Sequence, residues 1–328
     1  MTSNSLVSIN ELKIDVRITK SLRLKIVDSA TFDVERGQIL GLIGESGSGK
    51  TMLCRSLVGT LGRRGAYIAG GDLVFDGIDL ITAKPADWRD IRGKRIGYVP
   101  QSALAGPNPV MTIGAQLAEA IEQSENHDKD YIRKRSLELL EIVQIRRPEI
   151  VMKQYPYDLS GGMKQRVMIA CAIAQQPSLI VADEPTTGLD VTVQAEIMDL
   201  LKRIRSEFNT SIILVSHDLP LINDVCDDIV VMHAGATVEK VSSAQVSHSL
   251  HPYTRALYSS RIDLVEPKGQ LITIKGQPPT VGQWPSGCRF ADRCDFVVDS
   301  CRRASAVPLV SVAQDHMTAC LRYDQIGK

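Results

Sequence analysis

The chain has 328 residues, which is long enough for one large hydrophobic core and a smaller appended unit. Its 38 Lys and Arg residues balance 38 Asp and Glu residues, so no overall positive field attracts it to nucleic acid or anionic lipid. No stretch approaches the roughly 18 apolar residues of a membrane-spanning helix, and the N-terminus lacks the basic and apolar regions of a signal peptide. We therefore expect a cytosolic protein that reaches a membrane only through a partner.

The N-terminal part of the chain alternates strand patterns with one helix. Apolar and polar residues alternate over 14–18 and again over 32–34, which predicts antiparallel strands with one buried face. Residues 38–43 form a continuous apolar strand that leads into a glycine-rich segment, and a helix is expected to begin at Lys50. Residues 72–77 contain a strand and an Asp-Gly turn, which predicts a hairpin.

The middle of the chain changes character. Residues 102–176 are expected to form a helical insert, with Leu137, Leu140, Ile142 and Val143 at helical spacing. Short buried strands then resume, with an amphipathic helix between two of them. We expect an α/β fold, a parallel sheet with an antiparallel β subdomain, that binds phosphate at the carboxyl end of a strand. The remaining predicted strands are 95–99, 179–182, 212–215 and 228–232, and the last of these is expected to close the core.

Residues 44–51, Gly-Glu-Ser-Gly-Ser-Gly-Lys-Thr, fit the P-loop pattern G-x-x-x-x-G-K-[ST]. The glycines allow successive backbone N–H groups to turn inward around phosphate oxygens, Lys50 adds a positive charge, and Thr51 offers a hydroxyl to Mg²⁺. Alone, the pattern indicates only a nucleoside triphosphate. The residues expected to contact the nucleotide are Gly44, Ser46, Gly47, Ser48, Gly49, Lys50 and Thr51.

Four more segments follow the P-loop: Gln101, Leu-Ser-Gly-Gly-Met at 159–163, Leu-Ile-Val-Ala-Asp-Glu at 179–184, and His217. With the P-loop they resemble the ATP-binding subunits of ABC transporters, and the resemblance runs from about residue 7 to the C-terminus. The segment 159–163 is similar to the signature sequence that separates this family from other P-loop proteins. Another interpretation is a Gly-Gly turn capped by Ser160 that opens a helix, but a plain helix start does not need two consecutive glycines.

Two adjacent acids end the predicted strand at 179–182. The resemblance implies that Asp183 holds Mg²⁺ opposite Thr51. It also implies that Glu184 polarises the attacking water, either by accepting its proton or by orienting it. Alternatively, the two acids cap the turn at 185–188. Because two carboxylates at the end of an apolar strand are costly without a cation, the catalytic interpretation is favoured.

The resemblance assigns roles to four further segments as well. Gln101 corresponds to a glutamine that touches Mg²⁺ and the water and links the site to the transmembrane partner, although alone it would be interpreted as a solvated loop residue. His217 corresponds to the switch histidine that contacts the γ-phosphate, and we expect it to be the only histidine that ends a buried strand. The signature residues Ser160, Gly161 and Gly162 are expected to serve the nucleotide of a second ATPase protomer. Residues 188–190, Gly-Leu-Asp, resemble the loop that bridges the two protomers, and Asp190 is expected to contact nucleotide there.

One family element is missing from the sequence. Many members stack adenine on an aromatic residue before the P-loop, but no Phe, Tyr or Trp precedes Phe32 here. Phe32 lies inside a predicted strand, and the stacking position falls near residues 24–26. Adenine would then rest on aliphatic surface, with the loss of roughly 1 kcal/mol of aromatic contact.

The C-terminal part indicates a subfamily and carries four of the seven cysteines. Residues 251–257, 274–279, 287–290 and 293–294 (Arg-Cys) resemble the oligopeptide, dipeptide and nickel importer ATPases. The cysteine spacing, C-x5-C-x6-C-x18-C, lacks the C-x2-4-C pair usual in structural zinc sites. Four well-spread thiolates suit a [4Fe–4S] cluster better, and the resemblance implies the same, while zinc and reduced structural cysteines are the alternatives. The predicted cluster ligands are Cys288, Cys294, Cys301 and Cys320.

We therefore expect a P-loop ABC ATPase core over residues 1–250 and a small cysteine-rich C-terminal extension over 251–328. The resemblance implies an ATP-hydrolysing subunit of a bacterial importer for a peptide, an opine-like compound or a nickel chelate, at the cytoplasmic face of the inner membrane. It implies as partners a second, related ATPase subunit, two transmembrane permease subunits and an extracytoplasmic solute-binding protein, but no nucleic acid.

The alternative function is that of a soluble ABC ATPase acting on ribosomes or DNA. Such proteins usually carry tandem ATPase domains, coiled-coil inserts or basic arms, whereas this chain has one P-loop and a neutral charge balance. We expect the cluster to be structural or regulatory and separable from ATP binding, because residues before 220 account for the ATP chemistry.

Overall fold

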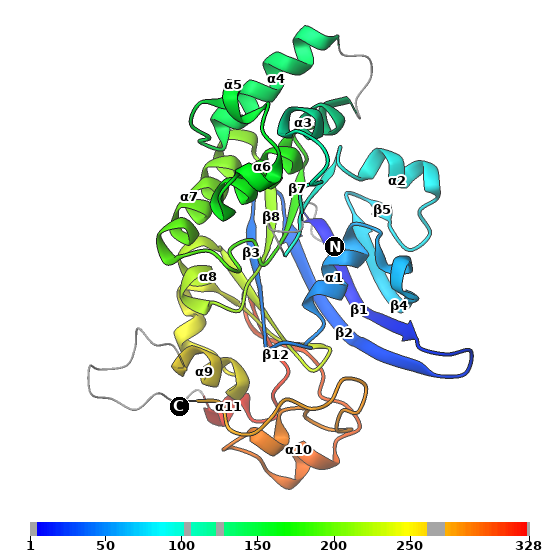
Figure 1. Cartoon of the computed structure of the whole chain (residues 1–328). Helices are drawn as coiled ribbons and strands as arrows, with labels where there is room; N and C mark the ends of the chain where they lie inside the picture. Colours follow the sequence, from blue (N-terminus) through cyan, green and yellow to red (C-terminus); the bar gives the residue numbers. More distant parts are fainter. Residues whose placement is uncertain (1–4, 102–105, 123–127, 261–272, 327–328) are drawn as a thin grey trace. The chain divides into compact units, whose positions relative to one another are not determined.

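The computed structural model describes residues 5–101, 106–122, 128–260 and 273–326 (Figure 1). By its internal contacts the chain divides into two compact units. The first unit contains residues 1–35, 39–82 and 216–328, and the second contains residues 36–38 and 83–215. The predicted boundary near residue 250 stays a prediction.

The N-terminal strands of the first unit form an antiparallel group, as predicted. β1 (Ser5–Arg17) pairs with β2 (Arg23–Glu35) and with β4 (Ala66–Phe75), and β4 turns at residues 76–77 into β5 (Ile78–Asp79). One end of the prediction is wrong. Ile18 lies beyond β1 and is 54% exposed, because the chain turns there and its N–H donates to the carbonyl of Leu22.

The strand before the P-loop is β3 (Ile39–Ile43), and all of its residues are buried. It pairs in parallel with β9 (Asp228–His233), which was predicted to be the last strand of the core. That prediction is wrong. Ala234 and Gly235, with φ of 47° and 77°, turn the chain into β10 (Ala236–Ser242), which pairs antiparallel with β9. The strand order in the first unit is therefore β5-β4-β1-β2-β10-β9-β3.

The C-terminal tail, residues 251–328, adds strands to this sheet. β12 (His316–Thr318) pairs antiparallel with β10, and β11 (Val310–Ala313) pairs with β12. The described residues of the tail are coloured from yellow-brown to red in Figure 1. The helical segments of the first unit are α1 (Lys50–Leu57), η1 (Leu61–Arg64), α8 (Leu219–Val225), η3 (Ser243–His248), α9 (Pro252–Ser259), η5 (Ala291–Arg293), α10 (Asp299–Arg303) and α11 (Tyr323–Ile326).

The second unit contains three parallel strands and the predicted helical insert. β7 (Leu179–Asp183) lies between β6 (Ile96–Val99) and β8 (Ser211–Val215). Residues 102–105 and 123–127 of the insert lie outside the described residues. The helical segments of this unit are α2 (Pro85–Ile91), α3 (Ile113–Glu122), α4 (Lys129–Ile142), α5 (Pro148–Val151), η2 (Pro156–Asp158), α6 (Gly161–Ile173) and α7 (Val191–Phe208).

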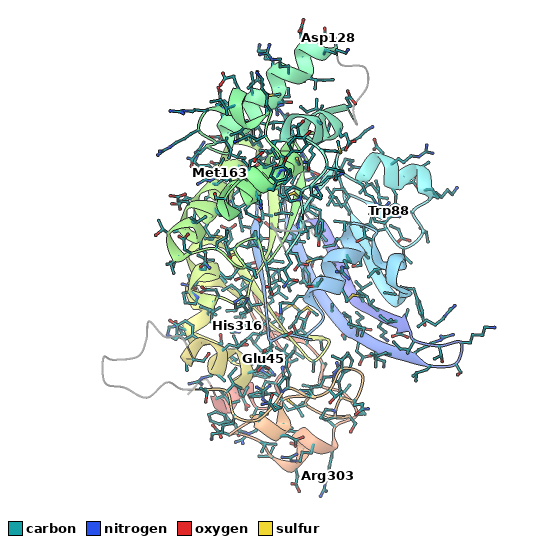
Figure 2. All side chains as sticks on the ribbon, in the orientation of Figure 1. Glu45, Trp88, Asp128, Met163, Arg303 and His316 are labelled. Carbon is teal, nitrogen blue, oxygen red and sulfur yellow. The ribbon has the colours of Figure 1, made fainter. Side chains whose placement is uncertain are left out.

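Caps and apolar periodicity explain the helices of the second unit. Asp128, labelled in Figure 2, begins α4 because its carboxylate accepts the N–H of Tyr131 at 2.7 Å. All the residues of α7 that were predicted to face the core are buried. In α4 the buried face differs from the predicted one, because Leu137 and Ile142 are only half-buried. The α7 residues concerned are Ile197, Leu200, Leu201 and Ile204. Among the helices described, none has both the length and the apolar character to cross a bilayer.

Candidate functional site

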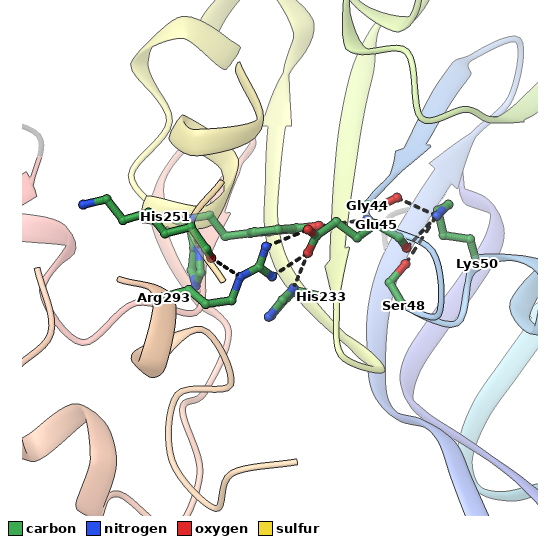
Figure 3. Close-up of polar contacts among 9 residues, drawn as sticks. Gly44, Glu45, Ser48, Lys50, His233, His251 and Arg293 are labelled. Atoms are coloured by element: carbon green, nitrogen blue, oxygen red, sulfur yellow. Dashed lines mark hydrogen bonds and ion pairs between the residues drawn. The ribbon is translucent and has the colours of Figure 1, made fainter. Parts of the chain in front are cut away.

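The P-loop lies in the first unit, between β3 and α1. Gly44 has φ of 149°, and a Cβ on it would lie 2.1 Å from the carbonyl oxygen of Met232, so only glycine fits. Lys50 is 6% exposed, and its Nζ donates to the carbonyl oxygens of Gly44 (2.6 Å) and Glu45 (3.1 Å) and to Oγ of Ser48 (3.4 Å) (Figure 3). The side chain of Lys50 therefore folds back onto the P-loop, where it was predicted to contact phosphate.

Glu45 lies at the centre of a network that the sequence did not predict. Nη1 and Nη2 of Arg293 donate to its two carboxylate oxygens, each at 2.7 Å (Figure 3). The N–H of Glu45 donates to the hydroxyl of Tyr253 at 2.8 Å. Burial raises the pKa of Glu45, but the hydrogen bonds and charge of Arg293 outweigh this and hold the pKa below its ordinary value. Glu45 is therefore ionised at neutral pH.

His233 ends β9 in the same network. It is 1% exposed, and its ring lies 4.3 Å from that of Tyr253 and 5.6 Å from that of Phe290. Burial lowers the pKa of His233 to about 4, so it is neutral at neutral pH, and the 3.7 Å contact from Nδ1 to Glu45 is not an ion pair. The expectation that His217 alone among the histidines ends a buried strand is therefore wrong. The strand predicted at 228–232 continues one residue further, to His233.

In the second unit the structure brings two predicted catalytic residues together. Nε2 of Gln101 donates to Oε2 of Glu184 at 3.0 Å, and Oγ1 of Thr187 donates to the same oxygen at 2.9 Å. The backbone of Glu184 has φ of 49° and donates its N–H to the carbonyl of Val215. A carboxylate held by two donors in a fixed turn has a defined orientation, as a general base requires.

Asp183 ends β7 and is 1% exposed. The hydroxyl of Tyr98 on β6 donates to its Oδ2 at 3.5 Å. A buried carboxylate of this kind suits a hard cation such as Mg²⁺, which prefers oxygen ligands. The strand predicted at 179–182 is present as β7, which extends one residue further to Asp183, and Glu184 follows it directly.

The signature segment, residues 159–163, leads into α6, and Ser160 caps the N-terminus of this helix as the alternative interpretation predicted. Oγ of Ser160 accepts the N–H of Met163 at 3.3 Å (Met163 is labelled in Figure 2). A Cβ on Gly162 would lie 2.8 Å from Cγ1 of Val193 on α7, so the glycine also permits a close approach. Asp190 begins α7 and accepts the N–H of Val193 at 3.0 Å.

The predicted ATP-site residues thus fall into two groups, one in each unit. The first unit contains the P-loop residues and His217, which is exposed and follows β8 in the chain. The residues of the second unit are Gln101, Ser160, Gly161, Gly162, Asp183, Glu184 and Asp190.

The tail also lies against the predicted adenine position. A Cβ added to Gly282 would lie 2.4 Å from Cδ1 of Leu24. A Cβ added to Gly47 of the P-loop would lie 3.4 Å from Cγ2 of Val281 in the tail. The ring of Trp284 packs on Gly235, where an added Cβ would meet it at 2.3 Å. An aromatic side chain is therefore present in this region, but it comes from the tail and not from the strand before the P-loop.

The four clustered cysteines line one small cavity of about 20 Å³. All four are free thiols, and two accept backbone N–H groups from two residues further on: Cys294 from Phe296 and Cys320 from Arg322, both at 3.4 Å. Burial, and then the charges of the other three cysteines, raise the pKa of Cys320 to about 11. Across the part of the chain that the structure describes, no three or more His, Cys, Asp or Glu side chains are arranged to hold a metal ion. The cysteines thus share a cavity without forming a ligand set.

Comparisons with known proteins relate the whole chain to one family. The profile of the ABC transporter family matches residues 27–187, that of the oligopeptide/dipeptide transporter C-terminal region matches 238–301, and that of an AAA domain matches 152–224. The oligopeptide transport ATP-binding protein AppD of Bacillus subtilis is 37% identical, covering 99% of this chain and 98% of AppD. OppD of Haemophilus influenzae, also an oligopeptide transport ATP-binding protein, is 39% identical over 85% of this chain and 86% of its own.

Solved structures show the same fold. A dimeric ATP-binding cassette in a post-hydrolysis state, with bound ADP and phosphate, superposes with a TM-score of 0.65 at 24% identity. The match covers 72% of this chain and 98% of that one. At this level of identity the likeness supports the fold alone.

Proposed function

Since the chain belongs to the ATP-binding subunits of ABC transporters and is an ATPase of that family, we propose that it powers a bacterial importer for peptides. The observation that carries this proposal is the relationship to an oligopeptide transport protein over 99% of the chain, tail included. Opine-like compounds and nickel chelates remain alternative cargoes, because recognition of the cargo takes place in partner subunits. The balanced charge and the importer-type tail do not favour the ribosome- or DNA-directed alternative.

Within the ATP reaction, each residue keeps the role that the family implies. We propose that the P-loop N–H groups and Lys50 bind the phosphates and that His217 contacts the γ-phosphate. Glu184, oriented by Gln101, accepts a proton from the attacking water or orients it. Mg²⁺, when bound, would neutralise phosphate charge. The hydroxyl of Thr51, the carboxylate of Asp183 and the amide oxygen of Gln101 are the oxygen donors proposed to hold it.

The active ATPase is proposed to be a pair of subunits. Ser160, Gly161, Gly162 and Asp190 would complete the nucleotide site of the partner protomer, which is proposed to be a related but different ATPase chain. Two permease subunits and an extracytoplasmic solute-binding protein would complete the importer. The chain would then lie at the cytoplasmic face of the plasma membrane.

Association with membrane subunits tests this function. We expect the tagged chain to co-purify from detergent-solubilised membranes with permease subunits and a second ATPase, and the isolated complex to hydrolyse ATP. Mass spectrometry of the eluate and release of phosphate are the measurements. Co-purification with ribosomes or DNA in place of membrane proteins would contradict the proposal.

For the cysteine-lined cavity we propose a [4Fe–4S] cluster. The support is that four free thiols line one cavity and that backbone N–H groups donate to two of the sulfur atoms. Hydrogen bonds of this kind to ligating sulfurs tune such clusters. A cluster would also hold together a tail whose helices and strands are short, as metal sites do in small domains.

Metal content tests the cluster. Protein purified without oxygen is expected to be brown and to contain about four irons per chain, the number set by the cluster type. Replacing Cys294 by Ser should remove the colour, whereas the control Cys171→Ser on α6, outside the tail, should keep it. Iron and zinc are measured by elemental analysis. Stoichiometric zinc without iron would disprove the cluster and leave the zinc alternative.

A further inference from the structure

An ion pair between Glu45 and Arg293 joins the P-loop to the tail, and neither residue has a role in the ATP reaction described above. Glu45 is the second residue of the P-loop, and Arg293 is the last residue of η5 in the tail. Both nitrogens at the end of the guanidinium donate to the carboxylate at 2.7 Å (Figure 3). This bidentate geometry is the strongest form of an Arg–carboxylate pair, and it fixes the relative orientation of the two groups as well as their distance.

Both ends of the pair are held in place. The side chain of Arg293 is 5% exposed, its Nε donates to the carbonyl of Lys275 at 2.8 Å, and its guanidinium lies 5.5 Å from the centre of the Phe290 ring. The backbone of Glu45 donates to Tyr253, and its carbonyl accepts from the N–H of Ser48 at 3.2 Å as well as from Lys50. The conformation at Glu45 is therefore coupled directly to the loop and to its lysine.

The position of Arg293 depends in turn on the cysteine-lined cavity. Arg293 immediately precedes Cys294, and η5 lies between Cys288 and Cys294 in the chain. The N–H of Ala291 donates to the carbonyl of Cys288 at 3.0 Å, and the N–H of Cys288 donates to that of Cys301 at 2.8 Å. The short segment that carries Arg293 is thus built on the backbone of three of the four cysteines.

The Glu45–Arg293 pair affects ATP binding through the negative charge of Glu45. The P-loop binds an anion, yet its second residue is an ionised carboxylate. Without Arg293, that negative charge would stand uncompensated beside a site for a triphosphate, and the Glu45 side chain would lose its anchor. The repulsion and the loss of anchoring both act against ATP binding.

We propose that Arg293 is a positioning residue for the ATP site: it neutralises Glu45 and fixes the P-loop, so that the affinity for ATP depends on the folded cysteine-rich tail. The inference rests on the proposed function, because it concerns the same nucleotide. It replaces the expectation that the tail is separable from ATP binding.

A double-mutant cycle on the full-length chain tests the proposal, with a fluorescent ATP analogue and Mg²⁺ as the probe. We expect Arg293→Gln to raise the Kd on the order of tenfold, the size of coupling typical of directly bonded charged residues. Glu45→Gln removes the charge as well as the anchor and should raise the Kd less. In the Glu45→Gln background, Arg293→Gln should have almost no further effect. Arg293→Lys keeps the charge but cannot form the bidentate pair, so its Kd for the ATP analogue should fall between the parental value and that of Arg293→Gln.

The matched control is Arg303→Gln, since Arg303 is a tail arginine on α10 that is 82% exposed and pairs with Asp299. It should leave the Kd unchanged. Thermal midpoints are measured for every variant, because a purely structural role would lower the midpoint and leave the Kd of the folded fraction unchanged.

Two results would overturn the inference: an unchanged Kd in Arg293→Gln, or equal effects of that change with and without Glu45→Gln. Should Arg293→Gln fail to fold, Arg293→Lys measured in both backgrounds gives the same comparison. A parental chain that binds no ATP would instead contradict the proposed function, so the two failures are distinguishable.

Discussion

Replacing Glu184 by Gln is expected to slow ATP hydrolysis by ~10²–10⁴-fold, the usual contribution of a positioned base, and to leave ATP binding largely intact. Gln101 and Thr187 both donate to one oxygen of Glu184, and a glutamine retains a carbonyl oxygen that accepts both bonds. The shape of the turn is therefore preserved while the capacity to accept a proton is lost. Bound ATP should then hold the paired subunits in their closed state.

Single-turnover hydrolysis in the purified complex measures this effect, with Kd for ATP determined in parallel. Glu207→Gln is the matched control, since Glu207 is a half-exposed α7 residue that contacts Arg203 at 3.6 Å. Hydrolysis at the parental rate by the Glu184→Gln complex would show that another group serves as the base.

Replacing Lys50 by Ala should weaken both ATP binding and turnover. Lys50 is buried, and its ammonium satisfies the carbonyl oxygens of Gly44 and Glu45. A hydrogen bond to a charged group contributes about 1.5–3 kcal/mol, so the Kd for ATP should rise by roughly 10- to 100-fold. Loss of the positive charge then acts on the transition state as well, where negative charge on the phosphates must be balanced.

Titration of ATP and steady-state hydrolysis separate the two effects of Lys50→Ala. The exposed α7 residue Lys202, which lies 3.8 Å from Asp199, provides the control when replaced by Ala. If Lys50→Ala binds ATP with the parental Kd, the lysine does not contact the phosphates in the ground state.

Features that depend on nearby residues were predictable from the sequence. The run of apolar residues at 38–43, the glycines after it and the helix from Lys50 appear in the structure as β3, the P-loop and α1. Leu179–Asp183 likewise forms a buried strand, which ends at Asp183 and is followed directly by Glu184. In these segments hydrophobic period, turn chemistry and motif all indicate the same local structure.

Features that depend on distant residues were not predictable. Glu45 and Arg293 are 248 positions apart, and the P-loop pattern places no requirement on its second residue. Arg293 belongs to the tail segments that resemble the importer family, but nothing in the sequence indicated its contact with Glu45. β10 was missed because its alternation is imperfect and it follows only a two-residue turn. The cysteine spacing did identify a group that shares one cavity, although the identity of any metal there stays a prediction.

The pairing of β12 with β10 has a consequence for how such a tail is gained or lost during evolution. Glu239 on β10 is fully buried, and its carboxylate accepts the N–H of Leu250 at 2.6 Å and bonds Nε2 of His316 on β12 at 2.8 Å. A chain that ended before β12 would expose an unpaired strand edge and leave this carboxylate without its histidine. A descendant that discarded the tail would therefore need a change at position 239 that removes the charge, such as Gln, which still offers an oxygen to the N–H of Leu250, so the two segments are expected to change together.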